Sequence, residues 1–342
     1  MLFVVTGGAG FVGSNLVEKL LSEGHHVRVI DDLSRPGGKV VENLNYLKEK
    51  FPGKVKSKDF EFINKSVTSF EDMKKNIRGA DVIYHLAAQT AVTTSIKNPA
   101  QDFATNAIGS FNVLEAARQV ADNSILLYTS TNKVYGNMPD MKLEEKPTRY
   151  EFADIKYKTG ISEDFSIDPE SPYGCSKYVA DAYFLDYNRT YGSKTVVFRC
   201  SCMYGEMQKS LEDQGWVSWL VSRILHDKKI IIYGDGKQIR DILHVKDVVD
   251  AVTKATEKIN ATKGQVFNMG GGVDNSISLL ELMNFVQKET GKKPVYEFAD
   301  WRLADQKVYI SNTEKARKIF GWQPKVSKEE GMRRQIKWES GE

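Results

Sequence analysis

The sequence predicts an α/β fold, in which a doubly wound parallel sheet is followed by a smaller, discontinuous C-terminal lobe. Short apolar segments alternate with amphipathic ones through the first part of the chain, which is typical of strands and helices that build a parallel sheet. The first apolar segment also leads directly into a glycine-rich turn. Beyond Gly205 the alternation loosens, so we expect one domain at 1–205 plus 241–272 and a second lobe at 206–240 plus 273–342.

Composition excludes several classes of partner. The 342 residues carry a net charge of +3, which gives no electrostatic case for binding nucleic acid or an anionic membrane. No apolar run approaches the roughly 20 residues of a membrane span, and the N-terminus does not resemble a signal peptide. The three cysteines and five histidines show no metal-ligand spacing, so we expect no metal and a reduced, cytoplasmic location.

The first thirty-two residues contain the clearest local signal. Residues 2–6 form an apolar strand, helical periodicity covers 14–22, and 27–30 is a second strand that ends in two aspartates. The glycines between strand and helix allow a tight turn and a close approach to a pyrophosphate, which the helix N-terminus would attract. An acid after the second strand can accept hydrogen bonds from ribose hydroxyls and repels a 2′-phosphate. The segment therefore predicts a Rossmann-type site that prefers NAD to NADP.

The segment 171–177 predicts the start of a helix that carries an acid/base pair. Ser171 suits the N-cap and Pro172 suits the first helical position. Tyr173 and Lys177 are four residues apart and share one helical face. A nearby ammonium stabilises phenolate and lowers the pKa of a tyrosine, which makes Tyr173 a candidate general acid/base.

The glycine spacing, with two residues between each pair, resembles that of the extended short-chain dehydrogenase/reductases, the NAD-dependent epimerase/dehydratase family. The apolar segment 81–89, Asn106 in a helical pattern over about 100–120, and the hydroxyl-rich segment 129–136 after a strand at 125–128 extend the resemblance. It implies a catalytic site of Thr131, Tyr173 and Lys177, with NAD as cofactor.

The resemblance also implies which residues contact NAD. Where the family often has an acid after the third strand, this chain has Ser66, which can still form a hydrogen bond. The full implied set is Gly7, Gly10, Phe11, Val12, Gly13, Asp31, Asp32, Ser34, Arg35, Ser66, Val67, Leu86, Ala87, Ala88, Gln89, Asn106, Thr129, Tyr173 and Lys177.

The second lobe is expected to hold the nucleotide of a nucleotide-sugar. Arg240 and Arg302 match arginine positions of the family, and guanidinium suits the geometry of a diphosphate. Tyr233 would either stack on a base or belong to the core. The insert 139–170 is expected to be irregular, and it would either cover the sugar or be disordered without ligand. The other implied substrate contacts are Gln89, Thr131, Asn132, Cys202, Met203, Gln214, Gly215, Trp216, Gln238 and Asp305.

The residues after Thr131 distinguish branches of the family. Dehydratases carry an Asp-Glu pair there and uronic-acid decarboxylases a glutamate, whereas this chain has Asn132 and Lys133. Four segments, 130–136, 171–177, 213–216 and 236–241, resemble the branch that inverts C2 of CDP-linked dideoxyhexoses such as CDP-paratose and CDP-tyvelose. The common 4-epimerase has an asparagine at the position of Cys202. This chain lacks that asparagine, which argues against a plain UDP-galactose 4-epimerase.

Three alternatives stay open at this point: a UDP-sugar 4-epimerase, a C2 epimerase of another nucleotide sugar, and an NAD-binding protein without catalysis. The helices expected at about 100–120 and 173–191 resemble the family's dimer-forming pair, so we expect a homodimer or homotetramer.

Overall fold

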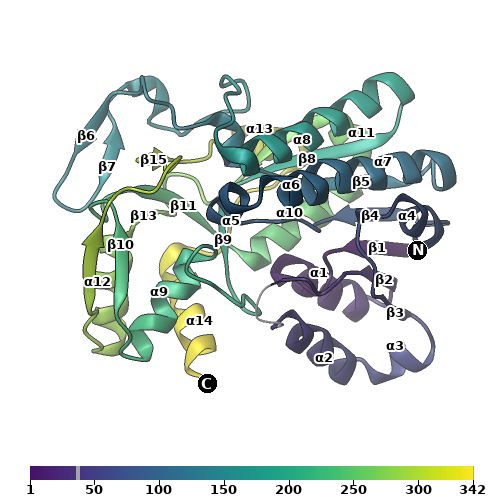
Figure 1. Cartoon of the computed structure of the whole chain (residues 1–342), viewed down its shortest axis with the longest axis horizontal. Helices are drawn as coiled ribbons and strands as arrows, with labels where there is room; N and C mark the ends of the chain where they lie inside the picture. Colours follow the sequence, from purple (N-terminus) through teal and green to yellow (C-terminus); the bar gives the residue numbers. More distant parts are fainter. Residues whose placement is uncertain (36–38, 342) are drawn as a thin grey trace. The chain divides into compact units, whose positions relative to one another are not determined.

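The computed structural model describes residues 1–35 and 39–341. A seven-stranded sheet with the order β12-β8-β5-β4-β1-β2-β3 runs through the fold (Figure 1), and all the described registers among β1 to β5 are parallel. The seven strands are β1 (Leu2–Thr6), β2 (His26–Ile30), β3 (Phe60–Ile63), β4 (Val82–His85), β5 (Ile125–Thr131), β8 (Lys194–Cys200) and β12 (Gln265–Met269). The doubly wound α/β prediction is confirmed.

The chain divides into two compact units. Unit 1 comprises Met1–Thr131, Ser171–Phe198 and Val249–Val266, and unit 2 comprises Asn132–Glu170, Arg199–Val248 and Phe267–Glu342. The expected domain bounds differ from this division in four segments. Residues 132–170, 199–205, 241–248 and 267–272 were expected in the dinucleotide-binding domain and belong to unit 2.

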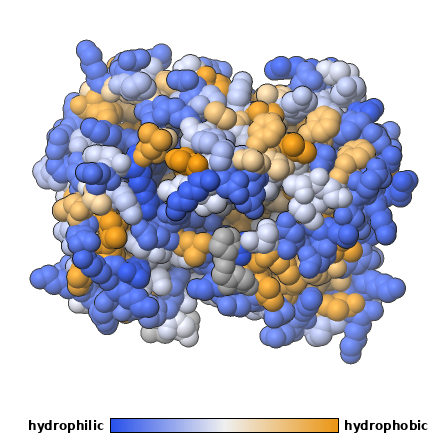
Figure 2. All heavy atoms as spheres, viewed as in Figure 1, coloured by the Kyte–Doolittle hydropathy of each residue, from blue (hydrophilic) through white to orange (hydrophobic). Residues whose placement is uncertain are grey.

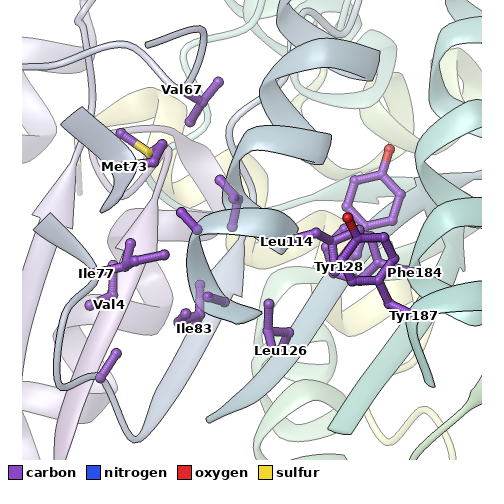
Figure 3. Close-up of a cluster of buried hydrophobic side chains, with 14 of the residues drawn as sticks. Val4, Val67, Met73, Ile77, Ile83, Leu114, Leu126, Tyr128, Phe184 and Tyr187 are labelled. Carbon is purple, nitrogen blue, oxygen red and sulfur yellow. The ribbon is translucent and has the colours of Figure 1, made fainter. Parts of the chain in front are cut away.

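Unit 1 is built around a buried apolar cluster on the sheet, which includes Val4, Ile83, Leu126 and Phe184 (Figure 3). The helices of unit 1 are α1 (Phe11–Ser22), α2 (Val40–Lys50), α3 (Pro52–Lys56), α4 (Phe70–Asn76), α5 (Val92–Lys97), α6 (Pro99–Phe103), α7 (Gly109–Val120), α8 (Ser171–Tyr191), α10 (Val245–Glu257), which begins in unit 2, and α11 (Ile259–Thr262). Longer helices such as α1 and α7 bury the apolar side of their sequence periodicity.

The helix expected over about 100–120 is in fact three pieces. A π-helical turn at Ala104–Ile108 separates α6 from α7. Such turns are uncommon and are often found at functional sites. Asn106 lies within this turn.

Unit 2 has its own apolar core, formed by side chains such as Val217, Ile230, Ile242 and Leu282. Its strands are β6 (Leu143–Glu145), β7 (Tyr150–Phe152), β9 (Cys202–Tyr204), β10 (Ile230–Tyr233), β11 (Ile239–His244), β13 (Ser276–Ser278), β14 (Tyr296–Ala299) and β15 (Val308–Tyr309). Its helices are α9 (Trp216–Leu225), α12 (Leu279–Thr290), α13 (Glu314–Phe320) and α14 (Lys328–Ser340), with 3₁₀ turns at Asn132–Tyr135 and Ile155–Tyr157.

The insert 139–170 is more regular than its sequence indicated. β6 and β7 pair antiparallel within it, with Leu143 opposite Phe152. The strands were missed because three-residue strands give too little alternation to recognise. Tyr150 and Phe152 are buried, which ties the hairpin to unit 2.

The visible surface in Figure 2 is mostly hydrophilic, with hydrophobic residues gathered in smaller patches. Within residues 1–35 and 39–341, none of the helices combines the length and apolar character needed to cross a membrane.

Candidate active site

The glycine-rich turn between β1 and α1 leaves no room for side chains at two positions. Gly7 has a φ of +70°, and a Cβ there would lie 2.6 Å from the Ala87 backbone nitrogen. A Cβ at Gly13 would lie 2.2 Å from the Gly7 carbonyl oxygen. Gly10 precedes α1, whose first residues are Phe11 and Val12, and it has no side chain to cover the helix N-terminus. This arrangement fits the pyrophosphate of a dinucleotide.

Asp31, at the end of β2, is held against this turn. Its carboxylate accepts hydrogen bonds from the backbone nitrogens of Ala9 at 3.1 Å and Leu33 at 2.9 Å. Burial raises the pKa of Asp31, and these two N–H groups act in the opposite direction. The neighbouring Asp32 is exposed and accepts from the Ser34 nitrogen at 3.0 Å. The side chain placed beside the turn is therefore Asp31.

The other predicted cofactor contacts lie at the ends of neighbouring strands in unit 1. After β4, the Leu86 nitrogen donates to the Thr6 carbonyl at 3.1 Å, which places 86–88 beside Gly7. After β3, the Ser66 hydroxyl accepts from the Thr68 hydroxyl at 3.1 Å and Val67 is buried. Arg35 is partly buried, and Thr129 lies within β5, two residues before its last residue.

The start of α8 is fixed by two side chains. The Ser171 hydroxyl accepts from the Gly174 nitrogen at 3.3 Å, as expected of an N-cap. The Tyr173 nitrogen donates to the Ser95 hydroxyl of α5 at 3.1 Å. Lys177 follows one turn later and is 3% exposed, with its Nζ 4.4 Å from the centre of the Tyr128 ring. Thr131 is buried at the last residue of β5.

Gln89 and Asn106 belong to a buried polar network. The Asn106 side chain accepts from the Gln89 nitrogen at 2.9 Å and donates to the Gln89 carbonyl at 3.0 Å. Both side chains also donate to the carboxylate of Asp102, which is fully buried and also accepts from Ser176. Neither Asp102 nor Ser176 was expected to belong to the site, since helical Asp and Ser usually face solvent.

In unit 2, Arg240 and Asp305 are brought together. The Arg240 Nη2 lies 2.6 Å from Asp305 Oδ1, and Arg240 is 7% exposed. Lys133 Nζ donates to the Ala304 carbonyl at 2.9 Å and lies 4.0 Å from the same Asp305 oxygen. Burial lowers the pKa of Lys133 to about 8, helped by repulsion from Arg240. Asn132 contacts the residue that follows Asp305, because its Nδ2 donates to Gln306 Oε1 at 3.1 Å.

Arg302 is paired with different acids from those of Arg240. Its Nη2 lies 3.4 Å from Asp213 Oδ1 and 3.6 Å from Glu212 Oε1, and its guanidinium covers the ring of Tyr233. Tyr233 is only partly buried, so it is not a core residue. Gln238 is buried and donates from Nε2 to the Tyr233 carbonyl at 2.8 Å.

The remaining predicted substrate residues lie on β9 and at the start of α9. Cys202 and Met203 are partly buried, and burial raises the pKa of the Cys202 thiol. Gln214 precedes Gly215, which has a φ of +80° and forms the N-cap of α9, and Trp216 is the first residue of that helix.

A search with family models finds one match over residues 4–335, to the family described as GDP-mannose 4,6 dehydratase. Among curated proteins, CDP-paratose 2-epimerase of Salmonella typhi is 39% identical over 347 aligned residues, which cover 99% of each chain.

Solved structures show the same full-length similarity. UDP-glucose 4-epimerase of Thermotoga maritima with UDP-glucose is 32% identical at a TM-score of 0.82. UDP-glucose 4-epimerase of Thermus thermophilus in complex with NAD is 29% identical, also at 0.82. Each alignment covers 100% of this chain and 99% of the other.

Proposed function

Because this chain belongs to the NAD-dependent epimerase/dehydratase family, we propose that it is a nucleotide-sugar epimerase that inverts C2 of a CDP-linked dideoxyhexose such as CDP-paratose or CDP-tyvelose. The choice of C2 and of a CDP-linked sugar is supported by the full-length similarity to CDP-paratose 2-epimerase. UDP-sugar 4-epimerases are the second candidate, because a solved example with UDP-glucose aligns over the whole chain.

NAD is the proposed cofactor, and unit 1 offers it a fitting site. The turn at Gly7 and Gly13 excludes side chains and so lets a pyrophosphate approach the backbone. Asp31 would accept from the ribose hydroxyls. When bound, NAD would take a hydride from the sugar carbon and return it to the opposite face.

The chain's own residues would move the proton and hold the oxygen. As phenolate, Tyr173 removes the proton from the C2 hydroxyl and later returns it, while the ammonium of Lys177 stabilises the phenolate. Thr131 donates a hydrogen bond to the reacting oxygen, which carries more negative charge as the carbon is oxidised. Arg240 and Arg302 hold the diphosphate, so the 2-keto sugar can turn without leaving.

The apolar face of α7 and α8 supports a proposed homodimer or homotetramer. Phe111 on α7 and Tyr183 on α8 are each more than a third exposed, and their rings meet edge to face at 5.6 Å. Ile108, which ends the π-helical turn before α7, and Tyr191, the last residue of α8, are exposed as well. Exposed aromatic side chains that pack against each other are typical of a protein interface.

An NMR experiment tests the reaction. The NAD-loaded protein is incubated with CDP-linked and UDP-linked hexoses in deuterated water, and the inverted carbon is identified. Inversion at C2 of a CDP-sugar without solvent deuterium is expected. Inversion at C4 would establish the second candidate, and deuterium at the inverted carbon would contradict the hydride mechanism.

A variant tests the role of Tyr173. Tyr173→Phe should abolish turnover and keep NAD bound, since only the phenolic oxygen is removed. Tyr46→Phe, at an exposed tyrosine of α2, is the matched control and should keep activity. Retained turnover in Tyr173→Phe would overturn the assignment.

A further inference from the structure

The carboxylate of Asp102 joins three segments of unit 1. It lies in α6 and is fully buried. Its Oδ1 accepts from Gln89 Nε2 at 2.9 Å, after β4, and from Asn106 Nδ2 at 3.1 Å, in the π-helical turn. Its Oδ2 accepts from the Ser176 hydroxyl of α8 at 2.5 Å. Both oxygens are thus engaged by side chains from separate segments.

Ser176 connects this carboxylate to the start of α8. It lies between Tyr173 and Lys177, and its Oγ is 3.1 Å from the Tyr173 carbonyl oxygen. The same Oγ accepts from Asn106 Nδ2 at 3.1 Å. A displacement of Ser176 would therefore move the turn of helix that carries both residues of the proposed acid/base pair.

A buried carboxylate is costly without compensation, so the charge of Asp102 needs an explanation. Three hydrogen bonds compensate part of that cost. Burial raises the pKa of Asp102, and the hydrogen bonds from Ser176 and Gln89 and the positive charge of Lys177 act in the opposite direction. Lys177 is itself only 3% exposed, so its ammonium is poorly solvated as well.

We propose that Asp102 is a positioning residue for the acid/base pair: through Ser176 it fixes the first turns of α8, and it keeps the Lys177 ammonium where it can stabilise the Tyr173 phenolate. The proposal rests on the proposed function. It also accounts for why the π-helical turn places Asn106 against both Asp102 and Ser176.

The test compares NAD-loaded full-length variants Asp102→Asn, Ser176→Ala and their combination. Asp102→Asn and Ser176→Ala should each lower kcat about tenfold or more per bound NAD, with KM changed less than about twofold, because misplaced catalytic groups affect the chemical step and not the binding of the nucleotide. The double variant should be no worse than the more damaging single variant, because both changes break one connection. Additive losses would overturn the proposal.

Asp247→Asn is the matched control, since Asp247 is also a buried carboxylate but accepts from Lys325 and Val326 in unit 2. It should lower the melting temperature and keep kcat per bound NAD. A purely structural role of Asp102 would give this same result for Asp102→Asn and would overturn the proposal.

A second measurement does not depend on turnover. Amide hydrogen exchange over 171–177 should accelerate in Asp102→Asn and Ser176→Ala but not in Asp247→Asn. If the wild type inverted no nucleotide sugar, the proposed function would be wrong. The exchange measurement would still test whether Asp102 positions the start of α8. Unchanged exchange over 171–177 would overturn it.

Discussion

The guanidinium carbon of Arg302 lies 3.9 Å from the centre of the Tyr233 ring. Such a short distance places the cation directly over the ring, where the two attract each other. Two acids, Glu212 and Asp213, neutralise the same guanidinium. A base could stack on this face of Tyr233 only after Arg302 had moved, and a diphosphate would have to replace the two carboxylates.

Arg302→Lys should therefore raise the KM for the nucleotide sugar about tenfold and leave kcat nearly unchanged. Lysine keeps the charge but lacks the parallel N–H groups that bind phosphate oxygens in pairs. Steady-state kinetics with the CDP-sugar would measure both parameters. Arg334→Lys, which affects only an ion pair with Glu330 on α14, is the control. An unchanged KM in Arg302→Lys would remove this residue from the proposed diphosphate site.

Elements with strong local signals were predicted closely. β1 has the predicted bounds, and β2 begins one residue before the expected 27–30. The Ser171 hydroxyl accepts from the Gly174 nitrogen at the start of α8, as its capping pattern indicated. These features depend on residues close in sequence, so periodicity and capping patterns reveal them.

The buried polar contacts could not be predicted in the same way. Asp102 and Ser176 are 74 residues apart, and nothing in the segment 171–177 indicates that Ser176 would bond to a distant carboxylate. Lys133 was noticed only as a replacement for an acid, whereas the structure also shows its ammonium bound to the Ala304 carbonyl. Such contacts depend on how distant segments pack, which periodicity does not report.

Gly13→Ala should abolish NAD binding and destabilise the protein, because the new Cβ would meet the Gly7 carbonyl oxygen at 2.2 Å. The turn must open, and its backbone then loses the position that a pyrophosphate needs. Calorimetric titration with NAD and a thermal melt would measure both effects. Gly53→Ala, with no atom within 4 Å of its new Cβ, should bind NAD like the wild type. Normal affinity in Gly13→Ala would argue against this turn as the cofactor site.

Asp31→Asn should weaken NAD binding and reduce the preference for NAD over NADP. The amide keeps the size of the side chain but removes the negative charge that repels a 2′-phosphate. The backbone N–H groups of Ala9 and Leu33 both donate to the carboxylate of Asp31. The NH₂ group of the asparagine cannot accept from one of them, and the lost hydrogen bond should lower the stability by about 1–3 kcal/mol. Asp32→Asn is the control, because Asp32 is exposed. Equal NAD to NADP affinity ratios in Asp31→Asn and the wild type would contradict the role of Asp31.

Lys133→Met should stabilise the protein near neutral pH and impair its activity. Burial lowers the pKa of Lys133 from its ordinary 10.5 to about 8 in the folded chain. Below pH 8 the folded state therefore carries a poorly solvated charge, whose removal is worth up to about 3 kcal/mol. Between pH 8 and 10.5 the unfolded chain binds more protons than the folded one, so the stability of the wild type rises with pH in this window. The advantage of Lys133→Met should accordingly shrink between pH 7 and pH 9.5.

Urea unfolding at the two pH values would measure this change, with the exposed Lys97→Met as the control. The titratable groups that act on Lys133 are Arg240, Asp305, Cys202 and Glu170, and all four remain in the variant. The variant loses the contacts of Lys133 with Ala304 and Asp305, which help to hold these residues beside Arg240. Activity should therefore fall through a higher KM for the nucleotide sugar. A stability difference that stayed constant from pH 7 to pH 9.5 would show that Lys133 does not carry the buried charge.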